Sequence, residues 1–260
     1  MTILDKIVIR KKEEVAAAKK NVSLAELEAM PLFQRNCYNL RESILDPNKT
    51  GIIAEYKRAS PSKGLINGTS TVEEVVAGYQ DAGASAISVL TDHDFFQGSL
   101  EDLTAARNVL QIPLLRKEFI VDSYQIAEAK AYGADIILLI AACLEKEEIK
   151  SLSEYAKSLG LNVFLEVHNE EELNKSIFPS IDAIGVNNRN LKDFSVSLDH
   201  SYDLVNKIPS QYIKVSESGI SDPETIKALK KAGFNAFLIG ENFMKTQNPM
   251  EAIKKFSCSI

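Results

Sequence analysis

The chain has 260 residues, of which 45% are hydrophobic and 25% charged, and its formal net charge at pH 7 is −6. This composition is typical of a globular protein with a large buried core. The negative charge and the lack of a long Lys/Arg block argue against nucleic acid or an anionic membrane as the main partner, because both require a concentrated positive field. We therefore expect that any anionic ligand is held by local charges.

Cysteine usage and the N-terminal sequence predict a protein of the cytoplasm. Cys37, Cys143 and Cys258 lie far apart and form no CxxC pair, so neither a disulfide framework nor a zinc site is expected. The N-terminus lacks an apolar run long enough for a signal peptide, and no stretch approaches the ~20 apolar residues of a membrane-spanning helix.

The first part of the chain is predicted to form short amphipathic helices. Ile3 and Ile7 are among the apolar residues that fall on one helical face. Ser23 and Glu26 have the spacing of a capping box, which predicts that a helix begins there. We interpret residues 1–50 as an N-terminal helical extension.

From Gly51 onward, apolar β-branched runs alternate with amphipathic runs. At four joins, a Gly suited to the left-handed position past a helix C-terminus precedes a near-continuous apolar run, as expected for parallel strands buried on both faces. These glycines are Gly83, Gly133, Gly160 and Gly233. The eight predicted strands are Ile52–Lys57, Ala86–Thr91, Pro113–Lys117, Asp135–Ile140, Val163–Val167, Ala183–Asn187, Ile213–Glu217 and Ala236–Gly240.

Amphipathic helices are predicted between these strands. Residues Thr71–Ala82 show helical spacing, and Ser221 and Glu224 have capping-box spacing, which predicts that a later helix begins near Ser221. Eight βα units favour a closed barrel over an open doubly wound sheet, and the chain has no GxGxxG or GxxxxGK[ST] loop to support the open alternative. The predicted fold is an α/β protein, a (β/α)8 TIM barrel over residues 51–260 that follows the helical extension.

The C-terminal ends of the predicted strands, where such barrels carry their active sites, are rich in polar residues. The residues in question are Glu55, Lys57, Lys117, Glu166, Asn187, Arg189 and Glu217. A single strand-end charge is explained equally well as solvated surface, but the convergence of the set on one rim favours a functional site. Lys and Glu side chains buried together shift one another's pKa values, which prepares acids and bases for work near neutral pH.

Two loops at the same rim predict a phosphate site. Ser218 and Gly219 follow the seventh strand, whereas Gly240 and Glu241 follow the eighth and could open a short helix at Glu241–Met244. Loops at these two positions, with the N-terminus of a short extra helix, recurrently bind phosphate because their N–H groups point at the anion. Ordinary turn glycines are the alternative explanation. The predicted partner is a small phosphorylated molecule.

The motifs that carry these residues occur in a diagnostic order. They are IIAEYKRASPSKG, LLRKEFIVDSYQI, LEVHNEEEL, IGVNNRNL, VSESGI and FLIGENFM. Through them the chain resembles the indole-3-glycerol phosphate synthase family over essentially its whole length. The resemblance implies a carboxy-lyase of tryptophan biosynthesis that works without metal or organic cofactor. It also implies a monofunctional enzyme, because the length leaves no room for the isomerase domain that is fused to the synthase in some bacteria.

The reaction that the resemblance implies converts 1-(2-carboxyphenylamino)-1-deoxyribulose 5-phosphate to indole-3-glycerol phosphate, with release of carbon dioxide and water. The implied catalytic residues are Glu55, Lys57, Lys117, Glu166, Asn187 and Glu217. Lys117 resembles the general acid that protonates the C2′ oxygen during ring closure, and Lys57 can pair with the ring carboxylate. Glu166, Glu55 and Lys57 resemble the residues used in the later dehydration, and the division of roles among these three stays open.

The resemblance also implies the residues that hold the substrate. Substrate-binding positions are Ser60, Pro61, Phe96, Phe119, Leu138, Arg189 and Leu191, and phosphate-binding positions are Ser60, Ser218, Gly219, Gly240 and Glu241. Ordinary core packing explains Leu138 better than it explains Phe96 and Phe119, which are expected in loops after strand ends. Glu241 replaces the small residue often found at its position, and an inward side chain there would repel a phosphate dianion.

Two other functions stay open on the sequence alone. A phosphoribosylanthranilate isomerase would need a Cys and an Asp at strand ends, and the first strand has no Cys. An inactive phosphate-binding barrel would keep the phosphate loops but would not need the matched Glu and Lys residues. His93, His168 and His200 share no ligand spacing and are expected in loops or at the surface. The expected assembly is a monomer, with a weak homodimer as the alternative.

Overall fold

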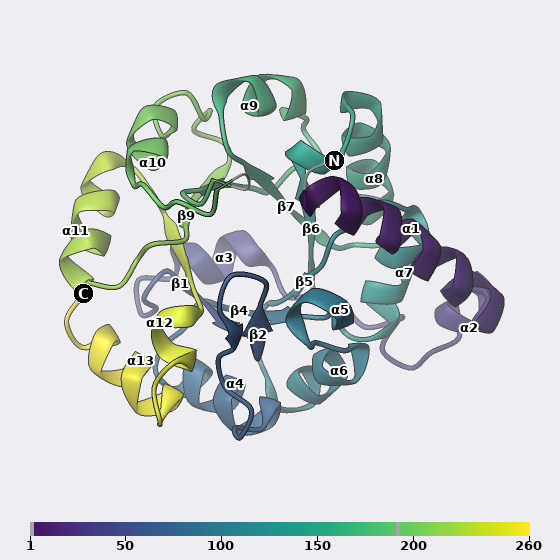
Figure 1. Ribbon diagram of the computed structural model, residues 1–260, viewed down its shortest axis with the longest axis horizontal. Coiled ribbons are helices and arrows are strands. Elements are labelled where there is room, and N and C mark those ends of the chain that lie inside the picture. Colours follow the sequence, from purple (N-terminus) through teal and green to yellow (C-terminus); the bar gives the residue numbers. More distant parts are fainter. Residues whose placement is uncertain (1–2, 191–192) are drawn as a thin grey trace.

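The computed structural model describes residues 3–190 and 193–260. Eight parallel strands close into a barrel, and helices surround the ring on its outside (Figure 1). The barrel strands are β1 (Ile52–Tyr56), β4 (Ala86–Leu90), β5 (Leu114–Lys117), β6 (Ile136–Ile140), β7 (Asn162–Val167), β8 (Ala183–Asn187), β9 (Ile213–Glu217) and β10 (Ala236–Ile239). The predicted TIM barrel is confirmed, and each predicted strand differs from the observed one by at most one residue at either end.

The main outer helices follow the barrel strands in chain order. They are α4 (Val72–Asp81), α6 (Leu100–Val109), α7 (Ser123–Ala131), α8 (Lys146–Ser158), α9 (Glu170–Ser176), α10 (Asp199–Leu204), α11 (Pro223–Ala232) and α13 (Pro249–Ser257). The prediction that Ser221 caps α11 was wrong by one residue. Asp222 is the N-cap and accepts from the Glu224 backbone N–H, because Pro223 supplies the fixed φ that suits the first helical position.

Shorter elements lie between these helices and strands. They are β2 (Ala59–Ser60), β3 (Gly64–Leu65), α5 (His93–Phe96), the 3-10 turn η1 (Ala141–Cys143) and α12 (Glu241–Met244). The strands β2 and β3 form a small antiparallel hairpin after β1. The helix α12 follows β10 directly, as predicted.

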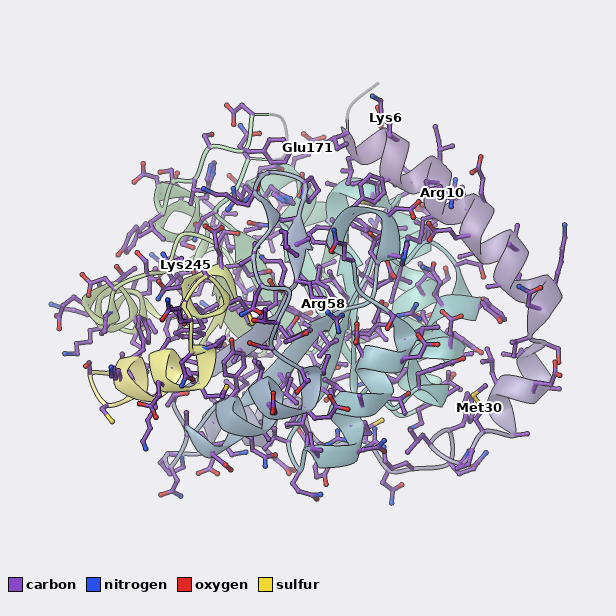
Figure 2. The ribbon with its side chains drawn as sticks, turned by 60° about the horizontal axis from the view of Figure 1, so that its bottom comes forward. Lys6, Arg10, Met30, Arg58, Glu171 and Lys245 are labelled. Carbon is purple, nitrogen blue, oxygen red and sulfur yellow. The ribbon has the colours of Figure 1, made fainter. Side chains whose placement is uncertain are left out.

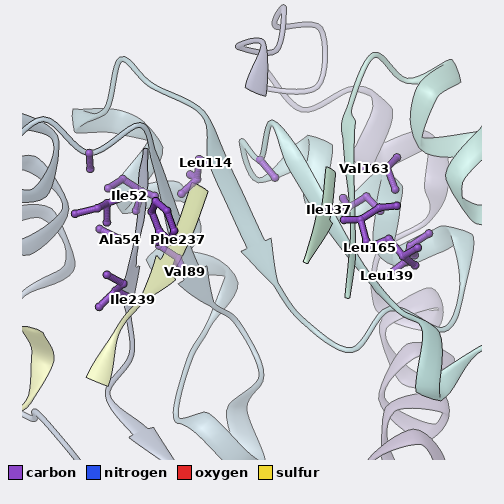
Figure 3. Packing of buried hydrophobic residues seen from close by; sticks show 14 of the residues in the cluster. Ile52, Ala54, Val89, Leu114, Ile137, Leu139, Val163, Leu165, Phe237 and Ile239 are labelled. Carbon is purple, nitrogen blue, oxygen red and sulfur yellow. The ribbon is translucent and has the colours of Figure 1, made fainter. Parts of the chain in front are cut away.

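Alternation along the strands divides the core into two layers. In β1, Ile52 and Ala54 belong to the layer between the barrel and the helices, together with Phe237 of β10 (Figure 3). Ile53 belongs to the barrel interior. Since successive side chains of a strand point to opposite faces, the interior position of Ile53 also places Glu55 on the inside.

The N-terminal extension contacts both ends of the barrel. The helix α3 (Leu40–Leu45) packs Leu40 and Ile44 against the interior side chains and lies behind the ring in Figure 1. The helices α1 (Ile3–Asn21) and α2 (Leu24–Glu28) lie along the opposite side, and Val15 and Leu27 pack against α7. The predicted capping box of Ser23 and Glu26 is confirmed. Within the described ranges, no helix has the length and apolarity needed to cross a membrane.

Candidate active site

A cavity lies at the C-terminal ends of the strands, and most of the predicted site residues line it. These residues are Glu55, Lys57, Ser60, Pro61, Phe96, Lys117, Phe119, Leu138, Glu166, Asn187, Arg189, Glu217, Ser218 and Glu241. Gly219 and Gly240 stand in the adjoining loops without lining the cavity. Leu191 lies outside the described residues. The structure thus brings residues from all eight strands of the barrel and the loops that follow them into one place.

Glu55 and Lys57 form an ion pair at the end of β1. The Lys57 Nζ lies 2.9 Å from Glu55 Oε1, and the Glu55 carboxylate is buried. Gly240 gives this carboxylate its space, because a Cβ at Gly240 would lie 2.7 Å from Glu55 Oε1. The glycine after β10 therefore has a structural role toward β1, whether or not a ligand approaches it.

Lys117 stands between two carboxylates on the inner face of the barrel. Its Nζ lies 2.6 Å from Glu166 Oε2 and 3.3 Å from Glu217 Oε2. The other Glu166 oxygen accepts from Asn187 Nδ2 at 2.9 Å. These contacts join β5, β7, β8 and β9, so the four strand ends hold one connected polar group.

The charges in this group set its protonation states. Burial opposes the charge of Lys117, but the carboxylates of Glu166, Glu217 and Glu55 outweigh it and hold the lysine pKa above its ordinary value. Burial likewise opposes the charge of Glu166, but Lys117 and His168 outweigh it and hold the pKa of that carboxyl well below its usual range. At neutral pH the pair is therefore an ammonium, which can donate a proton, beside a carboxylate, which can accept one.

Glu217 is the carboxyl that the environment favours in its protonated form. Burial raises its pKa to about 7, and the charges of Glu166 and Glu55 act in the same direction. Its Oε1 has no hydrogen-bond partner among the described residues. Gly185, two residues before Asn187 on β8, leaves room for this side chain, because a Cβ there would clash with Glu217 Oε1. Gly185 was not among the predicted site residues, although the alternation of β8 places it on the same face as Asn187.

The shift at Glu217 predicts a pH-dependent gain in stability for Glu217→Gln. The pKa of Glu217 in the folded state is about 7, above the ordinary value of 4.5. The proton on Glu217 therefore stabilises the fold fully below pH 4.5, and this stabilisation is lost as pH rises through 7. A neutral amide avoids this loss. We expect the variant to melt several degrees higher than the parent at pH 8 and close to it at pH 5, since about 1 kcal/mol moves Tm by about 2–4 °C in a domain of this size. Equal differences in Tm at both pH values would contradict the shift.

His168 lies in the turn after β7, as expected for a loop residue, but its side chain is not at the surface. Its side chain is largely buried at the end of β7, with Nε2 3.5 Å from Glu166 Oε1 and Nδ1 3.1 Å from Glu172 Oε2. Burial acts to lower its pKa, but Glu172 and Glu166 outweigh burial and raise the pKa. The position follows from strand alternation, because His168 stands two residues after the inward Glu166.

The loop after β9 is held by a buried polar network. Ser218 and Gly219 have φ values of 67° and 78°, and a non-glycine residue rarely adopts this left-handed conformation. Asn188 Nδ2 donates to the Ser218 backbone carbonyl at 3.1 Å, and Asn188 Oδ1 accepts from Ser201 Oγ at 2.9 Å. Ser218 Oγ donates to Asn187 Oδ1 at 2.9 Å. Buried hydrogen bonds from β8 and α10 thus fix the turn that presents Ser218 to the cavity.

Glu241 stands at the cavity between two cationic side chains. Its Oε1 lies 4.0 Å from Lys63 Nζ, and its Oε2 lies 3.9 Å from Arg189 Nη2. Ser60 lines the same part of the molecule from the β2–β3 hairpin. Glu241 therefore adopts the inward orientation that would repel a phosphate dianion. Lys63 and Arg189 are close enough to each other to bind one anion together.

Apolar side chains form one wall of the cavity. The rings of Phe96 and Phe119 have centroids 6.2 Å apart, and Leu138 adds an inward side chain from β6. Phe119 follows β5 in a loop as expected, but Phe96 ends the one-turn helix α5, because Asp92 caps that turn. Ile7, with Ile3 and Leu4, lines the cavity from α1 and was not among the predicted site residues. This wall suits a planar aromatic group.

Comparisons with known proteins agree with the motifs. The family model described as indole-3-glycerol phosphate synthase matches residues 4–256. A protein of that name from Bacteroides thetaiotaomicron is 46% identical over 258 residues, which cover 99% of this chain and 98% of the relative. One from Campylobacter fetus is 44% identical over 252 residues, which cover 97% of this chain and 98% of the relative.

Solved structures with little sequence similarity share the fold. Thiamine phosphate pyrophosphorylase from Pyrococcus furiosus has a TM-score of 0.58 at 18% identity and covers 85% of this chain and 97% of its own. A structure described as native KDPGal has a TM-score of 0.57 at 15% identity and covers 80% of this chain and 91% of its own. At these identities the likeness extends to the barrel architecture alone.

Proposed function

Because this chain belongs to the indole-3-glycerol phosphate synthase family, we propose that its cavity performs the ring closure, decarboxylation and dehydration that make indole-3-glycerol phosphate. The substrate is 1-(2-carboxyphenylamino)-1-deoxyribulose 5-phosphate. The observation that carries the proposal is Lys117, an ammonium held between Glu166 and Glu217 at the base of a cavity with an aromatic wall.

We propose that the two anionic ends of the substrate bind different groups at the rim. The phosphate would lie near Ser60, Ser218 and the loops that contain Gly219 and Gly240, with Arg189 nearby. Lys57 would meet the ring carboxylate, since its ammonium stands at the end of β1 beside Glu55. The aryl ring would pack between Phe96, Phe119 and the apolar side chains around them.

In this pose Lys117 acts as the general acid of ring closure. The aryl carbon, activated by the aniline nitrogen, attacks the C2′ ketone, and Lys117 protonates the oxygen as it gains charge. Rearomatisation then drives loss of carbon dioxide. Dehydration requires an acid for the C2′ hydroxyl and a base for a proton of the ring system, and Glu166 supplies the carboxylate closest to Lys117. Asn187 and Glu217 hydrogen-bond the substrate and orient these groups.

Turnover of this substrate tests the proposal. Indole-3-glycerol phosphate fluoresces, and the chain has no Trp, so product formation can be followed against a low background. A purified, folded protein that leaves the substrate unchanged would contradict the proposed function.

The product and inorganic phosphate should both protect the fold against heat. A ligand that binds only the native state adds RT ln(1 + [L]/Kd), about 2.7 kcal/mol at a 100-fold excess over Kd. Glu241→Gln should tighten phosphate binding by up to about fivefold, since loss of one partly exposed like charge is worth up to about 1 kcal/mol. The measurement is the shift in Tm with ligand concentration.

Glu251, an exposed residue of α13, provides the control for this experiment. Glu251→Gln makes the same change in net charge, so it should leave phosphate binding as in the parent. Equal gains in affinity for both variants would show an effect of net charge alone and would remove Glu241 from the phosphate site.

A further inference from the structure

A buried lysine of the N-terminal helix lies outside the proposed catalytic group. Lys11 of α1 is 3% exposed, and its Nζ lies 2.8 Å from Asp92 Oδ2 and 3.1 Å from Glu118 Oε1. The two carboxylates are 1% and 4% exposed. Taking an ammonium and two carboxylates out of water is costly, and their close contacts offset this cost only in a well-defined geometry. The cluster therefore fixes α1 relative to the ends of β4 and β5.

The same two carboxylates order the segments that carry the aromatic wall. Asp92 binds Lys11 through Oδ2, and its Oδ1 accepts from the Phe95 backbone N–H at 2.7 Å, which begins the turn that ends in Phe96. Glu118 Oε1 accepts from the Phe119 backbone N–H at 2.8 Å. One ammonium thus bridges the two acceptors that hold the main chain at both aromatic positions.

The helix that carries Lys11 also forms part of the cavity. Ile3, Leu4 and Ile7 line the cavity, and Ile7 stands one helical turn before Lys11 on the same face. Figure 2 shows Lys6 and Arg10 along the outer ribbon of this helix, which runs past the barrel at its edge. Asp92 and Glu118 also line the cavity, so the Lys11 cluster adjoins both the helical and the aromatic parts of the apolar wall.

We propose that Lys11 is a positioning residue that joins the docking of α1 to the placement of Phe96 and Phe119, and so sets the site for the aryl group of the ligand. The inference rests on the proposed function, because it concerns the aromatic end of the same substrate. In this role Lys11 makes no contact with the reacting atoms. Its loss should weaken recognition of the aromatic group and leave recognition of the phosphate unchanged.

The test compares two ligands that differ in the aromatic group. Indole-3-glycerol phosphate carries both ends, whereas glycerol 3-phosphate lacks the indole. In the full-length chain, Lys11→Met should raise the Kd of indole-3-glycerol phosphate about tenfold and leave the Kd of glycerol 3-phosphate within about twofold of the parent. Lys12, the exposed neighbour on α1, gives the control, and Lys12→Met should change neither Kd.

The outcomes separate this inference from the proposed function. A parent chain that does not bind indole-3-glycerol phosphate overturns both. If the parent binds indole-3-glycerol phosphate and Lys11→Met weakens the binding of both ligands equally, only the role of Lys11 is overturned. The same holds if Lys11→Met weakens the binding of neither ligand. If Lys11→Met does not fold, Asp92→Asn makes the same comparison. It keeps an acceptor for α5 while removing one of the three carboxylate charges that contact Lys11, the others being Glu14 and Glu118. It should then weaken only the indole ligand, and any other pattern overturns the role.

Discussion

Lys117→Ala should lower kcat by about 10²–10⁴, the usual contribution of a general acid, while the Kd of the product changes far less. The reason is that Lys117 is the ammonium held between Glu166 and Glu217, whereas the anionic ends of the ligand meet other groups. Lys117→Arg keeps the positive charge but does not readily give up a proton, so it should restore binding without restoring rate. The measurement is kcat with a direct Kd for each variant.

Circular dichroism and melting must show that both Lys117 variants are folded, because removal of Lys117 leaves two buried carboxylates close together. One of them should then take up a proton near neutral pH. A folded Lys117→Ala protein within a factor of a few of the parental kcat would remove Lys117 from the mechanism. The acid would then have to be sought at Lys57, Glu55 or Glu166.

Glu166→Gln should also lower the rate of indole formation by about 10²–10⁴, because the amide keeps the shape of the side chain but cannot accept a proton. Glu166 binds Lys117 and Asn187 at the same time, so its loss also affects how the acid is held. If Glu166 serves the dehydration, carbon dioxide release in a single turnover should proceed ahead of indole formation. Stopped-flow fluorescence and a carbon dioxide assay measure the two steps.

Glu172 offers a matched control, since its carboxylate holds the other nitrogen of His168 but does not line the cavity. Glu172→Gln should reduce the rate much less than Glu166→Gln. Equal losses in the two variants would assign the effect to His168. Equal slowing of carbon dioxide release and indole formation by Glu166→Gln would place its role at or before decarboxylation.

The barrel and the composition of its mouth were predictable because both depend on local patterns. Strand alternation fixes which side chains point inward, so Glu55 could be assigned to the interior from its spacing to Ile53. The same rule could have found Gly185 and His168. His168 was missed because the histidines were judged only for mutual ligand spacing, not for their distance from an inward carboxylate.

Contacts between distant parts of the chain were not readable in this way. Lys11 and Asp92 are 81 positions apart, and Lys11 stands next to the exposed Lys12 in a helix rich in charge. Helical spacing predicts a buried face but does not identify which lysine meets a buried partner. The bond from Asp92 to α5 is a local signal, since Asp is a favoured N-cap residue, yet its second contact with Lys11 depends on the docking of α1.

The most direct test that this one cavity closes the ring, decarboxylates and dehydrates is mass spectrometry of the products made from the carboxyphenylamino deoxyribulose phosphate. We predict indole-3-glycerol phosphate with one carbon dioxide and one water released per substrate, and no such conversion by a folded Lys117→Ala protein over the same time. A product that keeps its carboxyl group, such as an isomerised but unclosed sugar phosphate, would contradict the proposed reaction.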